Sequence, residues 1–224
     1  MATQLNNQFK TSILNHKTQK QNNPFTTTTQ RKRTIKFQVI NASSNGNNGK
    51  QLIESGKVRT IWPKEAFTIM NSEGFILLDV RPNWEREKAR VKGSLHVPMF
   101  VEDKDNGPLT LVKKWVHFGY IGLWTGQYFT TFNYEFLSQV ENVVPGKDTK
   151  VLVACGEGLR SITAASKLYN GGYENVGWLA GGFNRSKDND FLAIEGKEKL
   201  QYATIGGASY YFLQLLILLQ VVGK

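Results

Sequence analysis

The most constraining feature of the sequence is the segment of residues 151–169, in which an apolar run is followed by a glycine-containing turn and a helical pattern. Cys155, the only cysteine of the chain, lies at the end of the apolar run, and Ser161, which follows Arg160, begins the helical pattern. The unpaired N–H groups and the dipole of a helix N-terminus attract an anion. The segment is therefore expected to fold as a strand, a tight turn and a helix that together bind a negative charge.

The same segment is expected to make Cys155 a nucleophile. Gly156 and Gly158 allow the backbone to curl so that successive N–H groups point inward, and Arg160 brings a permanent positive charge near the sulfur. Both effects favour the thiolate, which is the reactive form of cysteine. A buried structural cysteine is the alternative, but the position at the end of a strand, not inside it, favours the nucleophile.

The motif Cys-x-x-Gly-x-Arg-Ser at the end of a strand resembles the active-site loop of the rhodanese (sulfurtransferase) family, and the resemblance extends over about residues 58–190. It implies an α/β fold: one domain whose central, mostly parallel five-stranded sheet is flanked by helices. It also implies that Cys155 and Arg160 are catalytic. The residues expected to contact the substrate are Gly156, Glu157, Gly158, Leu159, Ser161, Asp79 and Arg81.

The length of the loop distinguishes sulfur chemistry from phosphate chemistry. Four residues separate Cys155 from Arg160, whereas the related cell-cycle dual-specificity phosphatases have five and so leave room for a phosphate. A persulfide is therefore expected here in preference to a phosphoryl group. Glu157 adds a negative charge that is expected to repel an anionic donor such as thiosulfate by on the order of 1 kcal/mol or more.

Two further stretches resemble family signatures. The apolar run 75–78 predicts a buried strand of a parallel sheet. Asp79-Val80-Arg81 follows it and is therefore expected at the carboxyl end of the strand, where such sheets bind their ligands. The family's Gly-His-Ile-Pro-Gly-Ala-like turn corresponds to residues 89–94, where the histidine is missing. Asp79 either orients the loop or Arg160, or it caps a turn or pairs with Arg81. The closing Leu-x-Gly-Gly signature corresponds to residues 179–182.

The remaining pattern predicts the other elements of an α/β domain. His96 lies in apolar surroundings and is expected to be a hydrogen-bonded core residue, not a ligand. The expected strands are residues 58–61, at the edge of the sheet, 94–98 and 176–179, and the expected helices are residues 63–73, 84–90 and 134–140.

Residues 101–136 form a longer stretch than the core of a minimal domain requires. Nine of the 22 residues from 115 to 136 are aromatic. We expect a long loop with a helix that covers the sheet and buries these aromatic side chains. The alternative is a substrate entrance or a surface that rests on a membrane or a partner protein. His117 belongs to this stretch, but the sequence does not place it at the site.

The distribution of charge argues against nucleic-acid binding, although the formal net charge is +10. Residues 1–53 contain eight Lys and Arg and no acid, and removing these eight from the total of 28 leaves 20 basic against 18 acidic residues. Residues 1–42 therefore read as a transit peptide, with a plastid as the expected destination and a mitochondrion as the alternative. Residues 43–57 are expected to be a flexible linker.

The C-terminal segment predicts attachment to a membrane. Residues 201–223 carry no charge and would span about 34 Å as a helix, against about 30 Å for a bilayer core. We expect a transmembrane helix that follows a linker of residues 191–200 and tethers a stromal domain to the thylakoid or envelope membrane. An apolar helix docked on the domain or on another subunit is the alternative.

The single cysteine limits the mechanism. No intrachain disulfide and no resolving cysteine can form, two histidines outside the leader are too few for a metal site, and no cofactor motif is present. The expected function is that of a sulfurtransferase, of the thiosulfate or mercaptopyruvate type. It would carry a persulfide on Cys155 from a small-molecule donor to a thiol or other nucleophilic acceptor. The alternative is a catalytically weak module for docking or sensing at a membrane.

Overall fold

The structure is a computed structural model that describes residues 42–222, with side-chain surroundings for residues 48–219. The predicted transit peptide lies outside the described residues apart from Ala42, so it remains a prediction. The described residues belong to one compact unit.

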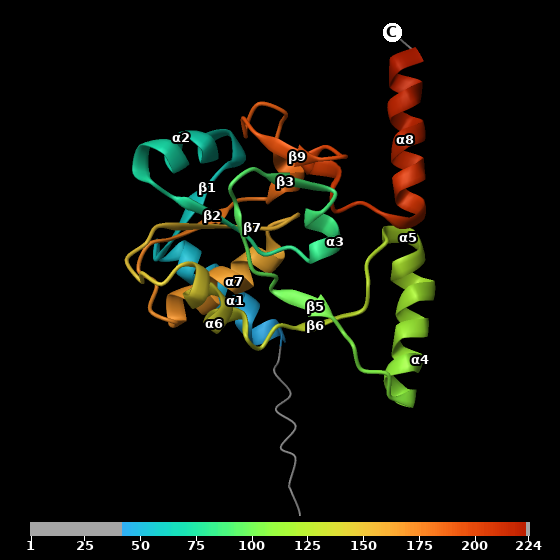
Figure 1. The fold of residues 1–224 in the computed structure, drawn as a ribbon, viewed down its shortest axis with the longest axis horizontal. Helices are drawn as coiled ribbons and strands as arrows, with labels where there is room; N and C mark the ends of the chain where they lie inside the picture. Colours follow the sequence, from blue (N-terminus) through green and yellow to red (C-terminus); the bar gives the residue numbers. More distant parts are fainter. Residues whose placement is uncertain (1–41, 223–224) are drawn as a thin grey trace, which may run out of the picture. The chain divides into compact units, whose positions relative to one another are not determined.

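Five parallel strands form the central sheet, in the order β1-β8-β7-β2-β4. This arrangement confirms the predicted parallel five-stranded sheet with its first strand at an edge (Figure 1). In the register, Asp79 lies opposite Ala154, so the carboxyl ends of β2 and β7 lie side by side. The strands are β1 Val58–Ile61, β2 Ile76–Asp79, β4 Leu95–His96, β7 Val151–Ala154 and β8 Val176–Leu179.

Both faces of the sheet are buried, which explains the continuous apolar runs of its central strands. Leu78 and Val153 point into one apolar cluster, and Leu77 and Leu152 point into the other. Helices α1, α6 and α7 lie on one side of the sheet and α2 lies on the other (Figure 1). The helices are α1 Ala42–Glu54, α2 Pro63–Glu73, α3 Asn83–Arg86, α6 Phe136–Val143 and α7 Leu159–Asn170.

Two segments expected to be linkers are folded. In residues 43–57, helix α1 packs against α7, and its Leu52 and Ile53 contact the core. In residues 191–200, β9 Ile194–Gly196 pairs with β3 Ala89–Val91, and Phe191 and Leu200 are buried. Both linker predictions were wrong because each segment carries apolar side chains that complete the core.

The helix predicted over residues 84–90 was too long. Helix α3 ends at Arg86, because the following residues turn into β3 and use their backbone groups to pair with β9. Residues 83–91 therefore form one turn of helix, α3, and one strand, β3, of a small antiparallel sheet at the carboxyl edge of the main sheet.

The insertion between β4 and α6 does not cover the sheet as expected. Trp115 and Tyr120 are 79% and 82% exposed. The insertion and the C-terminal helix lie along one side of the domain, where α5 meets the start of α8 (Figure 1). These elements are β5 Phe100–Glu102, α4 Pro108–His117, the π-helical turn η1 Phe118–Gly122, α5 Leu123–Thr125, β6 Thr130–Phe132 and α8 Gly207–Val222. The short helices η2 Phe183–Arg185 and η3 Leu200–Tyr202 lie between β8 and α8 in the chain.

The predicted transmembrane helix over residues 201–223 is not found. Among the described residues, no helix has the length and apolar character needed to cross a membrane. Part of the segment forms η3, and Gly207, with φ of 57°, begins the separate helix α8. The 16 residues of α8 extend about 24 Å, which is short of a bilayer core of about 30 Å.

His96 is half-buried, and its Nε2 donates to the carbonyl oxygen of Arg81 at 2.8 Å, as expected for a hydrogen-bonded core residue. Burial lowers the pKa of His96, and the bond to this carbonyl and the charge of Asp79 offset only part of that effect. The imidazole is therefore neutral in the folded protein at neutral pH.

This burial predicts a loss of stability in mild acid. An unfolded histidine takes up a proton near pH 6.5, above the lowered pKa of the folded state. The contribution of His96 to the free energy of unfolding is thus complete above about pH 6.5 and declines as the pH falls toward the pKa of the folded state. Urea unfolding should show a smaller decrease in the free energy of unfolding between about pH 7.5 and 5.5 for His96→Gln than for the wild type. Equal decreases would contradict this assignment.

Candidate active site

The sulfur of Cys155 lies at the N-terminus of α7, where the sequence placed it. Cys155 directly follows β7 and is buried. The backbone N–H groups of Gly158 and Ser161 donate to Sγ, at 3.1 and 3.3 Å. Gly158 has φ of 96°, a left-handed conformation that an L side chain rarely adopts and that turns its N–H toward the sulfur. The predicted strand, turn and helix around the sulfur are confirmed.

Ser161 provides an adjustable partner for the sulfur. The Cys155 thiol donates to Ser161 Oγ at 3.3 Å, and the Ser161 hydroxyl donates to the carbonyl oxygen of Gly158 at 2.9 Å. A hydroxyl can rotate between donor and acceptor roles. Loss of the thiol proton would therefore allow Ser161 to donate to the sulfur.

The closing glycine signature fixes the carbonyl groups of the loop. The N–H groups of Phe183 and Asn184 donate to the carbonyl oxygens of Cys155 and Gly156, both at 2.8 Å. Gly182 permits this approach because a side chain at its φ of 63° would collide with the same two carbonyl groups. The loop N–H groups thus remain directed at the sulfur while its carbonyl groups bond elsewhere.

Arg160 is held by a residue that the sequence analysis missed. Its guanidinium donates to both carboxylate oxygens of Glu85, at 2.7 and 2.6 Å, and Glu85 is only 1% exposed. Burial lowers the pKa of Arg160, but the bonds to Glu85 and the nearby Cys155 sulfur outweigh it, so the pKa is raised. The available signal was position, since Glu85 follows β2 at the ligand-binding edge of the sheet.

Asp79 and Arg81 lie behind the site and do not face it. Both are completely buried, and Arg81 donates to Asp79 through Nε at 3.0 Å and Nη2 at 2.7 Å. Arg81 also donates to the carbonyl of Ala89 and stacks on Phe183. Of the two roles considered for Asp79, the structure shows the pair with Arg81. Contrary to expectation, neither residue lines the cavity at Cys155.

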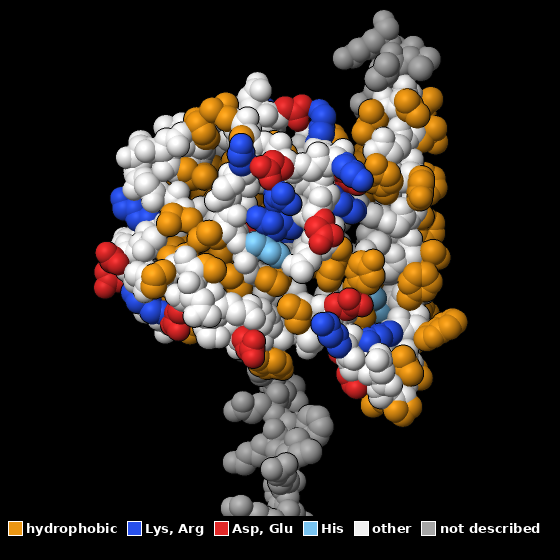
Figure 2. Space-filling view, in the orientation of Figure 1, with side chains coloured by type: hydrophobic (Ala, Val, Ile, Leu, Met, Phe, Trp, Pro, Cys, Tyr) orange, Lys and Arg blue, Asp and Glu red, His pale blue; other side chains and the backbone are white. Residues whose placement is uncertain are grey.

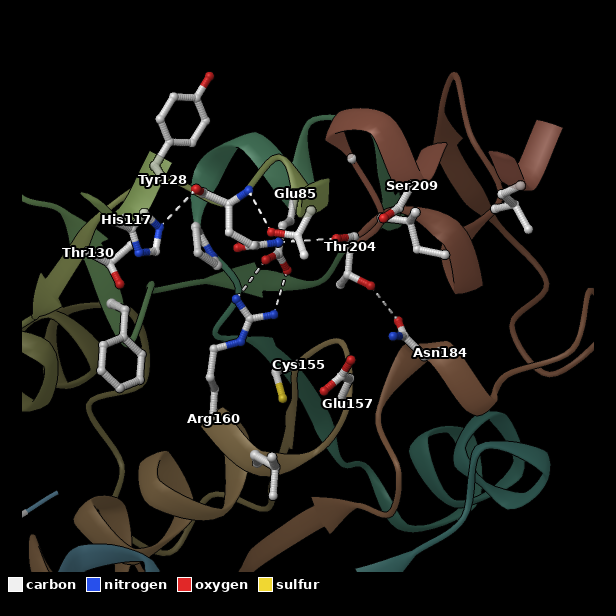
Figure 3. A pocket seen from close by; sticks show the side chains of 18 residues that line it. Glu85, His117, Tyr128, Thr130, Cys155, Glu157, Arg160, Asn184, Thr204 and Ser209 are labelled. Atoms are coloured by element: carbon white, nitrogen blue, oxygen red, sulfur yellow. Dashed lines mark hydrogen bonds and ion pairs between the residues drawn. The ribbon is translucent and has the colours of Figure 1, made fainter. Parts of the chain in front are cut away.

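A cavity of about 700 Å³ opens over the sulfur. Glu157, Leu159 and Arg160 border it on the loop side (Figure 3). The opposite wall comes from the insertion and from the segment around α8, and it includes His117 and Thr204 (Figure 3). The sequence could not place these wall residues, because they reach the site only through tertiary packing.

Hydrogen bonds join the parts of the cavity wall. Thr204 Oγ1 donates to Oδ1 of Asn184 at 2.9 Å, and Gln127 Nε2 donates to the carbonyl of Thr204 at 3.1 Å. The Nε2 of His117 lies 3.1 Å from the carbonyl oxygen of Gln127. The closing signature, the C-terminal segment and the insertion therefore form one continuous wall.

The charge near the sulfur is not balanced. The charge of Arg160 is matched by Glu85, whereas Glu157 is exposed at the cavity and has no ion-pair partner within residues 48–219. The described part of the chain contains no group of three or more His, Cys, Asp or Glu side chains that could hold a metal ion. The unpaired carboxylate of Glu157 therefore disfavours further negative charge at the cavity.

The family model for the rhodanese-like domain matches residues 63–189. Rhodanese-like domain-containing protein 10 of Arabidopsis thaliana is 62% identical over 193 residues, which cover 86% of this chain and 88% of that protein. Rhodanese-like domain-containing protein 11, chloroplastic, of the same plant is 44% identical, over 71% of this chain and 54% of that protein.

Among solved structures, thiosulfate sulfurtransferase from Pseudomonas aeruginosa aligns with 70% of this chain and 23% of its own, at 17% identity and a TM-score of 0.40. The family match covers more than half of the chain and includes the loop, Glu85 and the closing glycines. The chain therefore belongs to the rhodanese family.

Proposed function

We propose that the protein is a sulfurtransferase that carries sulfur as a persulfide on Cys155. The observation that supports this proposal is the position of Sγ. It lies at the floor of the cavity, accepts two backbone N–H bonds and has Arg160 beside it. N–H groups directed at a sulfur can stabilise the negative charge of a thiolate before the reaction and of a persulfide after it.

The reaction has two steps. The Cys155 thiolate attacks the outer sulfur of a donor, a sulfur–sulfur bond forms, and the remainder of the donor leaves with the electron pair of the broken bond. An acceptor thiolate then attacks the outer sulfur of the persulfide and regenerates the Cys155 thiolate. Each step moves one sulfur atom and needs no outside oxidant. Because the chain has one cysteine, the acceptor must be another molecule.

Each residue of the site has a separate role in the proposed reaction. Gly158 and Ser161 hold the inner sulfur through their N–H groups, and the Ser161 hydroxyl can turn to donate when the thiol loses its proton. Arg160, oriented by Glu85, faces the space that the outer sulfur would occupy. Glu157 selects among donors, because its carboxylate repels a dianion at the cavity more than it repels a singly charged donor.

We also propose that the protein works in a plastid. The leader is free of acidic residues, and relatives that are 44% and 36% identical to this chain are named chloroplastic.

A binding module is the second candidate function. It is favoured by the exposed aromatic side chains of the insertion, such as Trp115 and Tyr120, which are unusual on a small enzyme domain and typical of a docking surface. In that case the cavity would bind a ligand without transferring sulfur.

The two candidates predict different outcomes for Cys155. The protein treated with thiosulfate or mercaptopyruvate should gain the mass of one sulfur atom on the peptide that contains Cys155, and a thiol should remove it. Cys155→Ser should show no gain. Intact-mass and peptide mass spectrometry test this, and the absence of any adduct with either donor would favour the binding module.

The pair between Arg160 and Glu85 predicts a catalytic loss. Glu85→Gln should reduce the rate of persulfide formation at least about tenfold, because a partly buried guanidinium without its carboxylate changes position or recruits water. Stopped-flow measurement of donor consumption tests this, together with a thermal unfolding curve. Glu87→Gln, an exposed neighbour in the same segment, is the matched control and should retain the wild-type rate.

Glu157 predicts a change in donor preference. Glu157→Gln should lower the KM for thiosulfate about fivefold, as expected for removal of about 1 kcal/mol of repulsion, and should lower the KM for singly charged mercaptopyruvate less. Steady-state kinetics with both donors tests this. Glu174→Gln, an exposed carboxylate beside the opposite end of β7, should change neither value. An equal effect on both donors would contradict a role for charge.

A further inference from the structure

The exposed hydrophobic side chains of the domain are concentrated in two segments. Of the 24 large hydrophobic side chains that are exposed in the described part of the chain, 17 lie in residues 109–128 and 211–219. We call the exposed hydrophobic side chains of these two segments the apolar ridge. Exposed apolar surfaces of this extent mark sites of interaction with proteins or membranes.

The α4 part of the ridge has the pattern of a helix that lies in a membrane interface. At about 100° per residue, its exposed side chains cover an arc of about 160°. Lys113 and Lys114 lie on either side of this arc, each within about 60° of its edge. The exposed apolar side chains of α4 are Leu109, Leu111, Val112, Trp115 and Val116. Lysines that flank an apolar arc with a tryptophan are typical of helices that lie in a bilayer surface.

Helix α8 exposes an equally wide arc. Its exposed side chains run from Leu218 through Tyr211, Leu215 and Phe212 to Leu216, which spans about 160° around the helix. A helix that packs against protein buries a stripe of at least about 100°. The arc of α8 is wider than this minimum, and acyl chains can surround an arc of such width.

The two helices form one continuous surface. The rings of Trp124 and Phe212 stack with their centroids 6.4 Å apart, and both side chains are more than half exposed. The backbone at Gly126 lies against Gly206 and Gly207, where the end of α5 meets the start of α8. Figure 2 shows hydrophobic side chains along the same edge of the domain over both helices.

The charge of the ridge identifies its partner. Residues 106–134 and 199–224 contain no Asp or Glu, whereas Lys113 and Lys114 lie within the first of these stretches. Asp105, just before α4, accepts hydrogen bonds from the Gly107 N–H and the Thr110 hydroxyl at the N-terminus of this helix. Helices α4 and α8 themselves therefore combine apolar and aromatic side chains with positive charge and contain no acidic residue. That combination is complementary to anionic lipid headgroups above acyl chains.

We propose that the apolar ridge rests in one leaflet of a bilayer that contains anionic lipids, with α4 and α8 lying in the interface. Lys113 reaches the headgroups, and Trp115, Trp124 and Tyr211 enter the boundary between headgroups and acyl chains. The same elements contribute His117 and Leu213 to the cavity wall, so docking holds the Cys155 cavity beside the membrane surface. This inference does not depend on sulfur transfer.

Flotation of the full chain with vesicles tests the proposal. The protein should float with phosphatidylcholine vesicles that contain about one third phosphatidylglycerol, less with pure phosphatidylcholine, and less as salt increases. Tryptophan fluorescence should be quenched more by lipids brominated close to the headgroup than by lipids brominated near the chain end, because the helices lie in the interface.

Variants assign the binding to the ridge. Trp115→Ser, and Leu215→Ser combined with Leu218→Ser, should each lower the partition coefficient at least about tenfold, and Lys113→Glu should lower it for anionic vesicles only. Leu192→Ser, at a side chain that is 72% exposed outside the ridge, is the matched control and should bind as the wild type does. Thermal unfolding curves and the reactivity of Cys155 toward iodoacetamide verify the fold of each variant.

Three results would overturn the proposal. The first is a wild-type protein that stays with the vesicle-free fraction. The second is binding by the ridge variants at the wild-type level. The third is a dimer in analytical ultracentrifugation that ridge variants convert to a monomer while vesicle binding is absent, which would assign the surface to a second copy of the chain. A persulfide on Cys155 in a protein that fails to float would reject docking and retain the sulfurtransferase.

Discussion

The rest of the site depends on the directions in which the backbone N–H and carbonyl groups around Cys155 point. Its N–H groups must point inward to the sulfur, so its carbonyl groups point outward and need other donors. Phe183 and Asn184 supply two of these donors, and the indole of Trp178 supplies a third to Gly158. The central sheet brings these partners together, because β8 runs parallel to β7 and ends beside it. A short loop is thus held in this shape by the fold around it.

The orientation of the Arg160 side chain is also fixed by a partner from another part of the fold. In the proposed reaction, a guanidinium beside the reacting sulfur must keep its direction, and a bidentate carboxylate fixes a planar group better than a single bond does. Glu85 supplies that carboxylate from α3 while it remains buried. Asp79 and Arg81 form a second buried pair just behind it. The carboxyl edge of the sheet therefore holds both of these ion pairs, and only the first, Arg160 with Glu85, lines the cavity.

The sequence predicted the parts of the fold that local patterns encode. The apolar runs gave the parallel strands, and the spacing from Cys155 to Ser161 gave the loop and the start of α7. Partners far apart in the sequence were missed, such as Glu85, 75 residues before Arg160. The aromatic residues of the insertion were misread as a cover for the sheet because composition shows that a side chain is apolar, not which surface it faces. The apolar C-terminal segment was read as one long helix, although Gly207 begins a separate and shorter one.

In the proposed sulfurtransferase, the insertion and α8 determine how large a partner can reach the loop. A loop of this size needs little space for a donor as small as thiosulfate, yet the surrounding walls enclose about 700 Å³. Those walls are tied together by Gln127, Thr204 and Asn184, so the volume is a built feature of the domain. A large cavity with one unpaired carboxylate, Glu157, suits a bulky partner of low negative charge at one of the two steps. Since the donor gives up a single sulfur atom and the acceptor must be another molecule, the acceptor is the partner that this extra space fits best.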